Sequence, residues 1–174
     1  MNEIDNIDNG IVQQDQPRPG FLTTLCVLTF ITTGLGVFSA ISSLISGKLS
    51  EDQMLESKVA LAQSISQLKE AGMDSWVGMM EKIQAMTIQA NDHFFLGTML
   101  SFIAASIGVF AAMKMWKGYK QGFHFYIIYS LISVGSIYLY ISPSNIPSII
   151  IVANLLISGL FIFMYSRNLH WMTK

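Results

Sequence analysis

The sequence has few charged residues and almost no cysteine. Charged side chains make up 12% of the 174 residues, about half the share found in ordinary soluble domains. No aspartate or glutamate follows Asp92, so the second half of the chain has no carboxylate to solvate a surface. Cys26 is the only cysteine, which excludes an internal disulfide and a thiol cluster for a metal. These absences exclude an ordinary soluble domain and indicate that lipid is the solvent of much of the chain.

Four long apolar runs are present instead. A helix needs about 20 residues to cross the hydrocarbon core of a bilayer. Pro143 and Pro147 separate the last two runs, and Asn145 between them can cap the following helix. The sequence therefore predicts an all-α integral membrane protein with four transmembrane helices, at residues 21–45, 94–115, 123–141 and 146–165.

Positive charges lie beside these runs. The segment MKMWKGYKQGFHFY, residues 113–126, mixes lysines with aromatic rings, a combination that also occurs on nucleic-acid-binding surfaces. The net charge of −1 and the flanking spans argue against nucleic acid as a partner. Positive residues near span ends favour the cytoplasmic side of a membrane. We therefore interpret the positive residues beside the spans as anchors that set the orientation of the protein in the membrane. They are Arg18, Lys114, Lys117, Lys120 and Arg167.

This charge distribution predicts an inner (cytoplasmic) membrane protein of a bacterium with both termini inside. The cytoplasmic parts are then a disordered tail, a basic loop and a second tail, at residues 1–20, 116–122 and 166–174. Residues 46–93 and the short turn at 142–145 lie outside the cytoplasm. Aromatic side chains should mark the headgroup levels, with Tyr126 and Tyr165 among those on the inner side.

Residues 46–93 predict a periplasmic helical hairpin standing on the membrane. Ser50 and Gln53 have capping-box spacing, Gly72 ends the first helix, and Asp74 or Ser75 can cap the second. Glu81, Lys82 and Gln89 lie on the polar side of the second helix. Its apolar stripe either packs on the first helix or binds a partner protein, and consists of Trp76, Met79, Met80, Ile83 and Met86.

Small residues form one face of the second span. Such a face lets two helix backbones approach closely in lipid. It serves either the protein's own bundle or a foreign transmembrane helix, and its members are Gly97, Ser101, Ala104, Ala105, Gly108 and Ala112. Asn154 is the most polar side chain deep inside a span, and we expect it to form an interhelical hydrogen bond rather than to contact a substrate.

The sequence contains no recognisable catalytic constellation. His93, His124 and His170 are the only histidines, and the predicted topology separates the first from the other two by the membrane. No ionisable group lies at membrane depth, where a transporter or proton pump needs one. We therefore expect no enzymatic activity, no cofactor and no metal.

Two segments resemble a known group of proteins. The run PRPGFLTTLCVLTFITTGLG at residues 17–36 and the closing GLFIFMYSRNLHWM at 159–172 look like small four-span membrane proteins of Bacteroidota. The resemblance implies an inner-membrane location in a bacterium with two membranes, and it implies no activity.

These observations predict a non-catalytic accessory or stabilising subunit of a larger inner-membrane assembly. One candidate host is a protein secretion or translocation complex. The expected partners are other membrane proteins and membrane lipid, with a homo-oligomer left open. The alternative is a membrane protein that binds or transports a lipid or small molecule in a cavity lined by Ser, Thr and Asn154.

Overall fold

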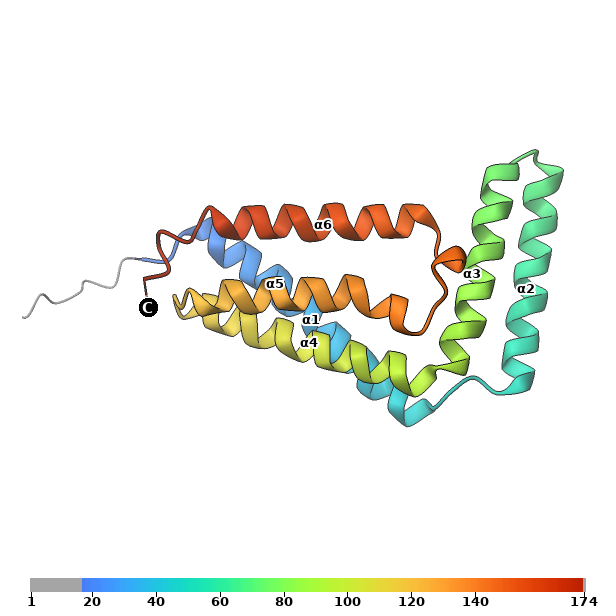
Figure 1. The fold of residues 1–174 in the computed structure, drawn as a ribbon, viewed down its shortest axis with the longest axis horizontal. Helices are drawn as coiled ribbons and strands as arrows, with labels where there is room; N and C mark the ends of the chain where they lie inside the picture. The colour runs from blue at the N-terminus through green and yellow to red at the C-terminus, as the bar shows by residue number, and fades with distance from the viewer. Residues whose placement is uncertain (1–16, 174) are drawn as a thin grey trace, which may run out of the picture.

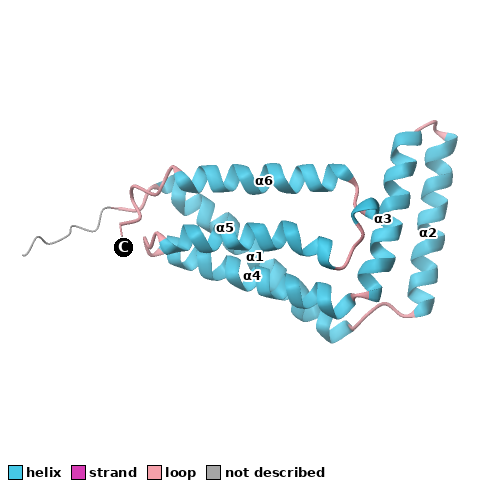
Figure 2. Cartoon of the chain, viewed as in Figure 1, coloured by secondary structure: helices cyan, strands magenta, loops and turns pink. Residues whose placement is uncertain are grey.

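The computed structural model describes residues 17–173, and the predicted all-α class is confirmed in this part of the chain (Figures 1 and 2). Residues 1–16, which make up most of the predicted N-terminal tail, and Lys174 lie outside the described residues. The elements are α1 (Gly20–Ser46), α2 (Glu51–Glu70), α3 (Asp74–Asp92), α4 (Phe94–Trp116), α5 (Gln121–Gly135), the 3₁₀ helices η1 (Ser136–Leu139) and η2 (Pro143–Asn145), and α6 (Ser148–Ser166).

Four helical segments are long and apolar enough to cross a membrane. They are α1, α4, α5 together with η1, and α6. Their length and composition indicate a multi-pass membrane protein. The third segment differs from the uniform helix predicted at 123–141, because α5 ends at Gly135 and continues as the tighter η1. Glycine and serine are weak helix formers, and 3₁₀ turns are frequent where an α-helix ends.

The spans pack unequally. Both α1 and α5 pack along α4, whereas α6 makes fewer contacts, which are with α5 and α1. Figure 1 shows α6 running beside α5 on the edge of the bundle.

The main hydrophobic core lies at the end of the bundle where the described chain begins and ends (the terminal end). Tyr165 near the end of α6 is fully buried there, and Met172 from the segment after α6 folds back into the same cluster. The buried members of this terminal core are Leu22, Leu25, Cys26, Ala111, Met115, Tyr126, Tyr165 and Met172.

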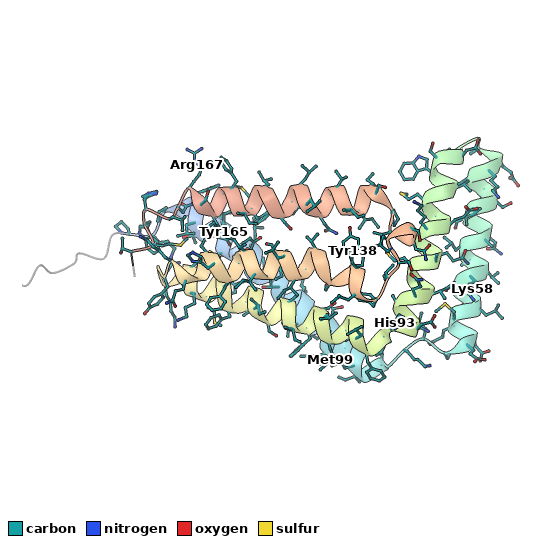
Figure 3. The ribbon with its side chains drawn as sticks, viewed as in Figure 1. Lys58, His93, Met99, Tyr138, Tyr165 and Arg167 are labelled. Atoms are coloured by element: carbon teal, nitrogen blue, oxygen red, sulfur yellow. The ribbon has the colours of Figure 1, made fainter. Side chains whose placement is uncertain are left out.

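The hairpin of α2 and α3 lies across the opposite ends of the spans, crosswise to them (Figure 1). This differs from the expected hairpin that stands on the membrane. The reason is the corner at His93, the one residue between α3 and α4 (Figure 3). Two side chains of α3 also hold the hairpin in place: Gln89 contacts Ser142 in the loop after η1, and Asn91 contacts Leu49 in the loop after α1.

Candidate partner-binding surfaces

The hairpin begins with the predicted cap. The Ser50 hydroxyl accepts a hydrogen bond from the Gln53 amide at 3.2 Å, and the Gln53 side chain accepts one from the Ser50 amide at 3.0 Å. This capping box satisfies two amides that a helix start leaves free. The start of α3 differs from the expectation, because Met73 occupies the N-cap position and no side chain caps the helix. The predicted caps at Asp74 and Ser75 are therefore wrong.

The hairpin has almost no core of its own. No residue of α2 is buried, and Val77 is the buried residue of α3. The apolar stripe of α2 is half-buried against α3, with members Met54, Leu61, Ile65 and Leu68. A two-helix unit of this size is marginal without further cover.

The predicted partner-binding stripe on α3 is not one continuous exposed face. Trp76 is 52% exposed, whereas Met79, Met80, Ile83 and Met86 are half-buried. The exposed apolar surface of the hairpin also includes Leu55 and Val59 of α2.

Polar side chains tie the hairpin to the rest of the protein. The Ser142 backbone amide donates to Gln89 Oε1 at 3.0 Å, and Gln89 Nε2 donates to the Ser142 hydroxyl at 3.4 Å. Likewise the Leu49 amide donates to Asn91 Oδ1 at 2.8 Å, and Asn91 Nδ2 donates to the Leu49 carbonyl at 3.3 Å. The polar flank of α3 therefore faces the span ends.

A cavity of about 420 Å³ lies where α3 meets the start of α6. It is in the size range of small-ligand sites. Asn154 does not line it, so it is not the cavity between spans that the alternative prediction described. Its lining residues are Ser75, Trp76, Gly78, Met79 and Lys82 from α3, and Pro147, Ser148 and Ile149 from the other side.

The small face of α4 is used mainly inside the protein. Ala104, Ala105, Gly108 and Ala112 are buried. Gly97 lies against Tyr140, since a β-carbon built on it would be 3.3 Å from that ring. Ser101 is exposed.

Gly108 marks the closest approach on this face. A β-carbon there would lie 2.5 Å from Thr33 Cγ2 and 3.1 Å from Tyr129 Cδ2. On the α1 side, Gly36 approaches Ala105, with 3.2 Å between its built β-carbon and that of the alanine. The glycines at positions 36 and 108 thus allow α1 and α5 to pack closely on α4. Little of this face is left free for a helix of another protein.

The fourth span is the least covered. Tyr165 is the buried residue of α6, and residues 152–157 are all exposed. Since an α-helix has 3.6 residues per turn, every side of α6 is uncovered over more than one turn. Asn154 lies in this stretch and has no hydrogen-bond partner among residues 17–173. The interhelical bond expected of it is not formed within the described chain.

The predicted orientation anchors gather at the terminal end. The Arg18 guanidinium carbon lies 3.8 Å from the Trp116 ring centre, and the Lys114 ammonium lies 4.8 Å from the Tyr119 ring centre. Both distances are typical of cation–π contacts. Lys117, Lys120 and Arg167 are exposed, and Figure 3 shows Arg167 at the end opposite the hairpin.

No metal-binding group is formed by the described residues, since no three His, Cys, Asp or Glu side chains come together in residues 17–173. The two histidines at the terminal end contact backbone carbonyls of their own turns: His124 Nδ1 lies 3.2 Å from the Lys120 oxygen and His170 Nδ1 lies 3.0 Å from the Arg167 oxygen.

Two contacts were not predicted from the sequence. The hydroxyls of Thr29 and Tyr165 form a buried hydrogen bond of 2.8 Å that joins α1 to α6. Gly122 lies in close contact with α4, because a β-carbon there would lie 2.6 Å from the Met115 backbone nitrogen. The second was missed because the prediction placed Gly122 in the loop at 116–122, whereas the helical segment begins at Gln121. The first had no signal in the sequence, because threonine and tyrosine are 136 positions apart.

Comparison with known proteins found no matching family model, no similar curated protein and no similar solved structure. The resemblance to small four-span proteins of Bacteroidota therefore rests on the two quoted segments and stays a prediction.

Proposed function

We propose that this protein is a non-catalytic accessory or stabilising subunit of a larger assembly in a bacterial inner membrane. It contacts a membrane protein partner through α6 and through the hairpin. The observation that carries the proposal is the Asn154 amide, which has no partner in the described chain and lies within the uncovered stretch of α6 at residues 152–157.

The position of Asn154 favours a helix of another protein as its neighbour. Lipid tails offer no hydrogen-bond partner, so an Asn154 side chain that faced only hydrocarbon would be energetically unfavourable. A polar side chain or carbonyl on a second helix satisfies it, and such bonds contribute about 1 kcal/mol to helix association. Asn154 and Tyr165 are separated by about three turns and lie on the same side of α6. A partner helix at Asn154 would therefore approach near α1 and α5.

The hairpin offers a second contact surface. Its single buried residue, Val77, leaves the α2–α3 pair with little stability of its own. Trp76, Leu55 and Val59 are exposed on it. Tryptophan is enriched among the residues that carry most of the binding energy of protein interfaces.

Affinity purification of the full chain from native membranes in a mild detergent tests this proposal. We expect a protein partner at a fixed molar ratio, measured by quantitative mass spectrometry. Asn154→Leu should lower its recovery about fivefold, the equivalent of roughly 1 kcal/mol. The matched control is Leu156→Val, also an exposed position but on the opposite side of α6, which should leave recovery unchanged.

Two results would overturn the proposal. One is a chain that carries lipid or a small molecule and no protein at a fixed ratio, which is the outcome that the alternative function predicts. The other is equal partner recovery with Asn154→Leu and with Leu156→Val, together with no loss in a Trp76→Ser, Met80→Ser double variant.

A further inference from the structure

The cavity between α3 and α6 lies at the boundary between membrane and water. Pro147, Ser148 and Ile149 line one wall, and they stand at the start of a candidate membrane span. The opposite wall comes from the hairpin, which lies outside the spans (Figure 1). A molecule in this cavity would therefore be in contact with both the hairpin and the edge of the hydrocarbon layer.

One cation faces an otherwise mainly apolar wall. Lys82 is the charged residue of the lining, and Ser75 and Ser148 bring hydroxyl groups. No carboxylate among residues 17–173 forms an ion pair with Lys82. Its charge is therefore available to an anion from outside the chain. Trp76 and Met79 line the same cavity, and tryptophan is the side chain most typical of the membrane headgroup level.

An apolar stripe leads from the cavity along the span. Ile149 lines the cavity and is exposed. It is followed at helical spacing by further exposed apolar side chains on the same side of α6, namely Val152, Leu156, Leu160 and Phe163. This stripe lies on the side of α6 opposite Asn154, so it is separate from the α6 surface proposed for a protein partner. Trp76 is shared between the cavity and the hairpin surface proposed for that partner.

We propose that this cavity binds the headgroup of an anionic phospholipid. The Lys82 ammonium binds the phosphate, the hydroxyls of Ser75 and Ser148 donate to its oxygens, and the acyl chains lie on the stripe that begins at Ile149. An inorganic phosphate would use the lysine and the two hydroxyls and leave the apolar wall uncovered. A phospholipid satisfies both parts of the site, and its binding does not depend on a protein partner.

Native mass spectrometry of the full chain, purified in detergent and mixed with phosphatidylglycerol or phosphatidylcholine, tests the proposal. Wild type should retain phosphatidylglycerol in preference to phosphatidylcholine, and excess inorganic phosphate should not displace it. Lys82→Gln should weaken phosphatidylglycerol binding about fivefold, as expected for one lysine near a charged headgroup. The control is Lys58→Gln, since Lys58 is exposed on α2 and does not line the cavity.

A second variant tests the cavity rather than the charge. Gly78 lines the cavity, and a β-carbon built on it meets no atom within 4 Å. Gly78→Leu should therefore fill the cavity and displace the lipid while keeping α3 helical, because leucine is a better helix former than glycine. Gly34→Leu is the matched control, at an equally open position of α1.

The expected result is loss of phosphatidylglycerol with both Lys82→Gln and Gly78→Leu, and retention with both controls. Three results would each overturn the proposal: equal retention of the two lipids by wild type, displacement by inorganic phosphate, or unchanged binding in Lys82→Gln and Gly78→Leu.

Discussion

A pair of hydroxyl groups holds the end of α6 to α1. Thr29 and Tyr165 meet at 2.8 Å, and both side chains are buried. The Tyr165 ring also packs on Tyr126, with 4.8 Å between ring centres. No other residue of α6 is buried. Tyr165 therefore holds the fourth span to the bundle more than any other residue of that helix.

Removal of the Tyr165 hydroxyl should therefore weaken the bundle without changing its shape. We expect Tyr165→Phe to lower the free energy of unfolding by about 1 kcal/mol, the net value of one hydrogen bond within a membrane protein. Titration of the purified protein with a denaturing detergent measures the change. Tyr138→Phe is the control, because Tyr138 is exposed and should tolerate the change.

A double-mutant cycle with Thr29→Val separates the hydrogen bond from the packing of the ring. If the two hydroxyls act together, the loss in the double variant should be smaller than the sum of the two single losses. Fully additive losses would show that the contact does not stabilise the protein.

Sequence patterns at the residue scale identified local contacts better than distant ones. The Ser50–Gln53 capping box was predicted correctly because both partners belong to one helical turn. The proposed cap at Asn145 was wrong, since Pro147 occupies the N-cap position of α6 and Asn145 lies in η2. Tyr126 and Tyr165 were expected at the headgroup level, and their burial in the terminal core depends on tertiary contacts that no spacing reveals.

At the scale of helices, glycines set how closely α4 approaches its neighbours. A β-carbon at Gly122 would meet backbone atoms of α4, at 2.6 Å from the Met115 nitrogen and 2.8 Å from the Ala111 oxygen. A β-carbon at Gly108 would meet side chains instead. Backbone atoms in a helix move less readily than side chains, so the two glycines should differ in their tolerance of a methyl group.

Three alanine substitutions test this order. We expect Gly122→Ala to lower the free energy of unfolding by about 2 kcal/mol through overpacking, and Gly108→Ala by about 1 kcal/mol. Gly135→Ala should be neutral or slightly stabilising, since nothing lies within 4 Å of its built β-carbon and alanine favours a helix. Detergent titration of the three variants gives the comparison. An unchanged stability of Gly122→Ala would contradict the close α4–α5 packing.

The spans could be predicted because their signal is the length of an apolar run, which needs no knowledge of neighbours. The start of α4 at Phe94 agrees with the prediction, and α1 extends one residue beyond it at each end. The direction of the hairpin could not be predicted, because it depends on the corner at His93 and on the Gln89–Ser142 contact. The difference in packing between α4 and α6 could not be predicted either, because the apolar residues of the two helices look alike in sequence although α4 is packed and α6 is largely uncovered.

The whole molecule has two different ends. The terminal end carries Arg18, Lys114, Lys117, Lys120 and Arg167, and the hairpin end carries the acidic residues of α2 and α3. Figure 3 shows Arg167 at the end opposite the hairpin. If positive charge stays on the cytoplasmic side, the hairpin lies outside the cytoplasm.

Single cysteines at the two ends test this orientation. In a Cys26→Ala background, Lys58→Cys on the hairpin should react with a membrane-impermeant maleimide when the inner membrane is intact. Lys117→Cys should react only after that membrane is disrupted. Both positions are exposed in the structure, so accessibility is set by the membrane. The reverse pattern would contradict the proposed topology.

The crosswise position of the hairpin limits how far the protein extends from the bilayer. A hairpin with arms of 20 residues that pointed straight out would reach about 30 Å into the aqueous phase. Two helices stacked flat on the span ends reach only about 20 Å. A protein that docks on Trp76 or Val59 must therefore come within about 20 Å of the span ends, which favours a neighbour that is itself held at the membrane over one that diffuses freely.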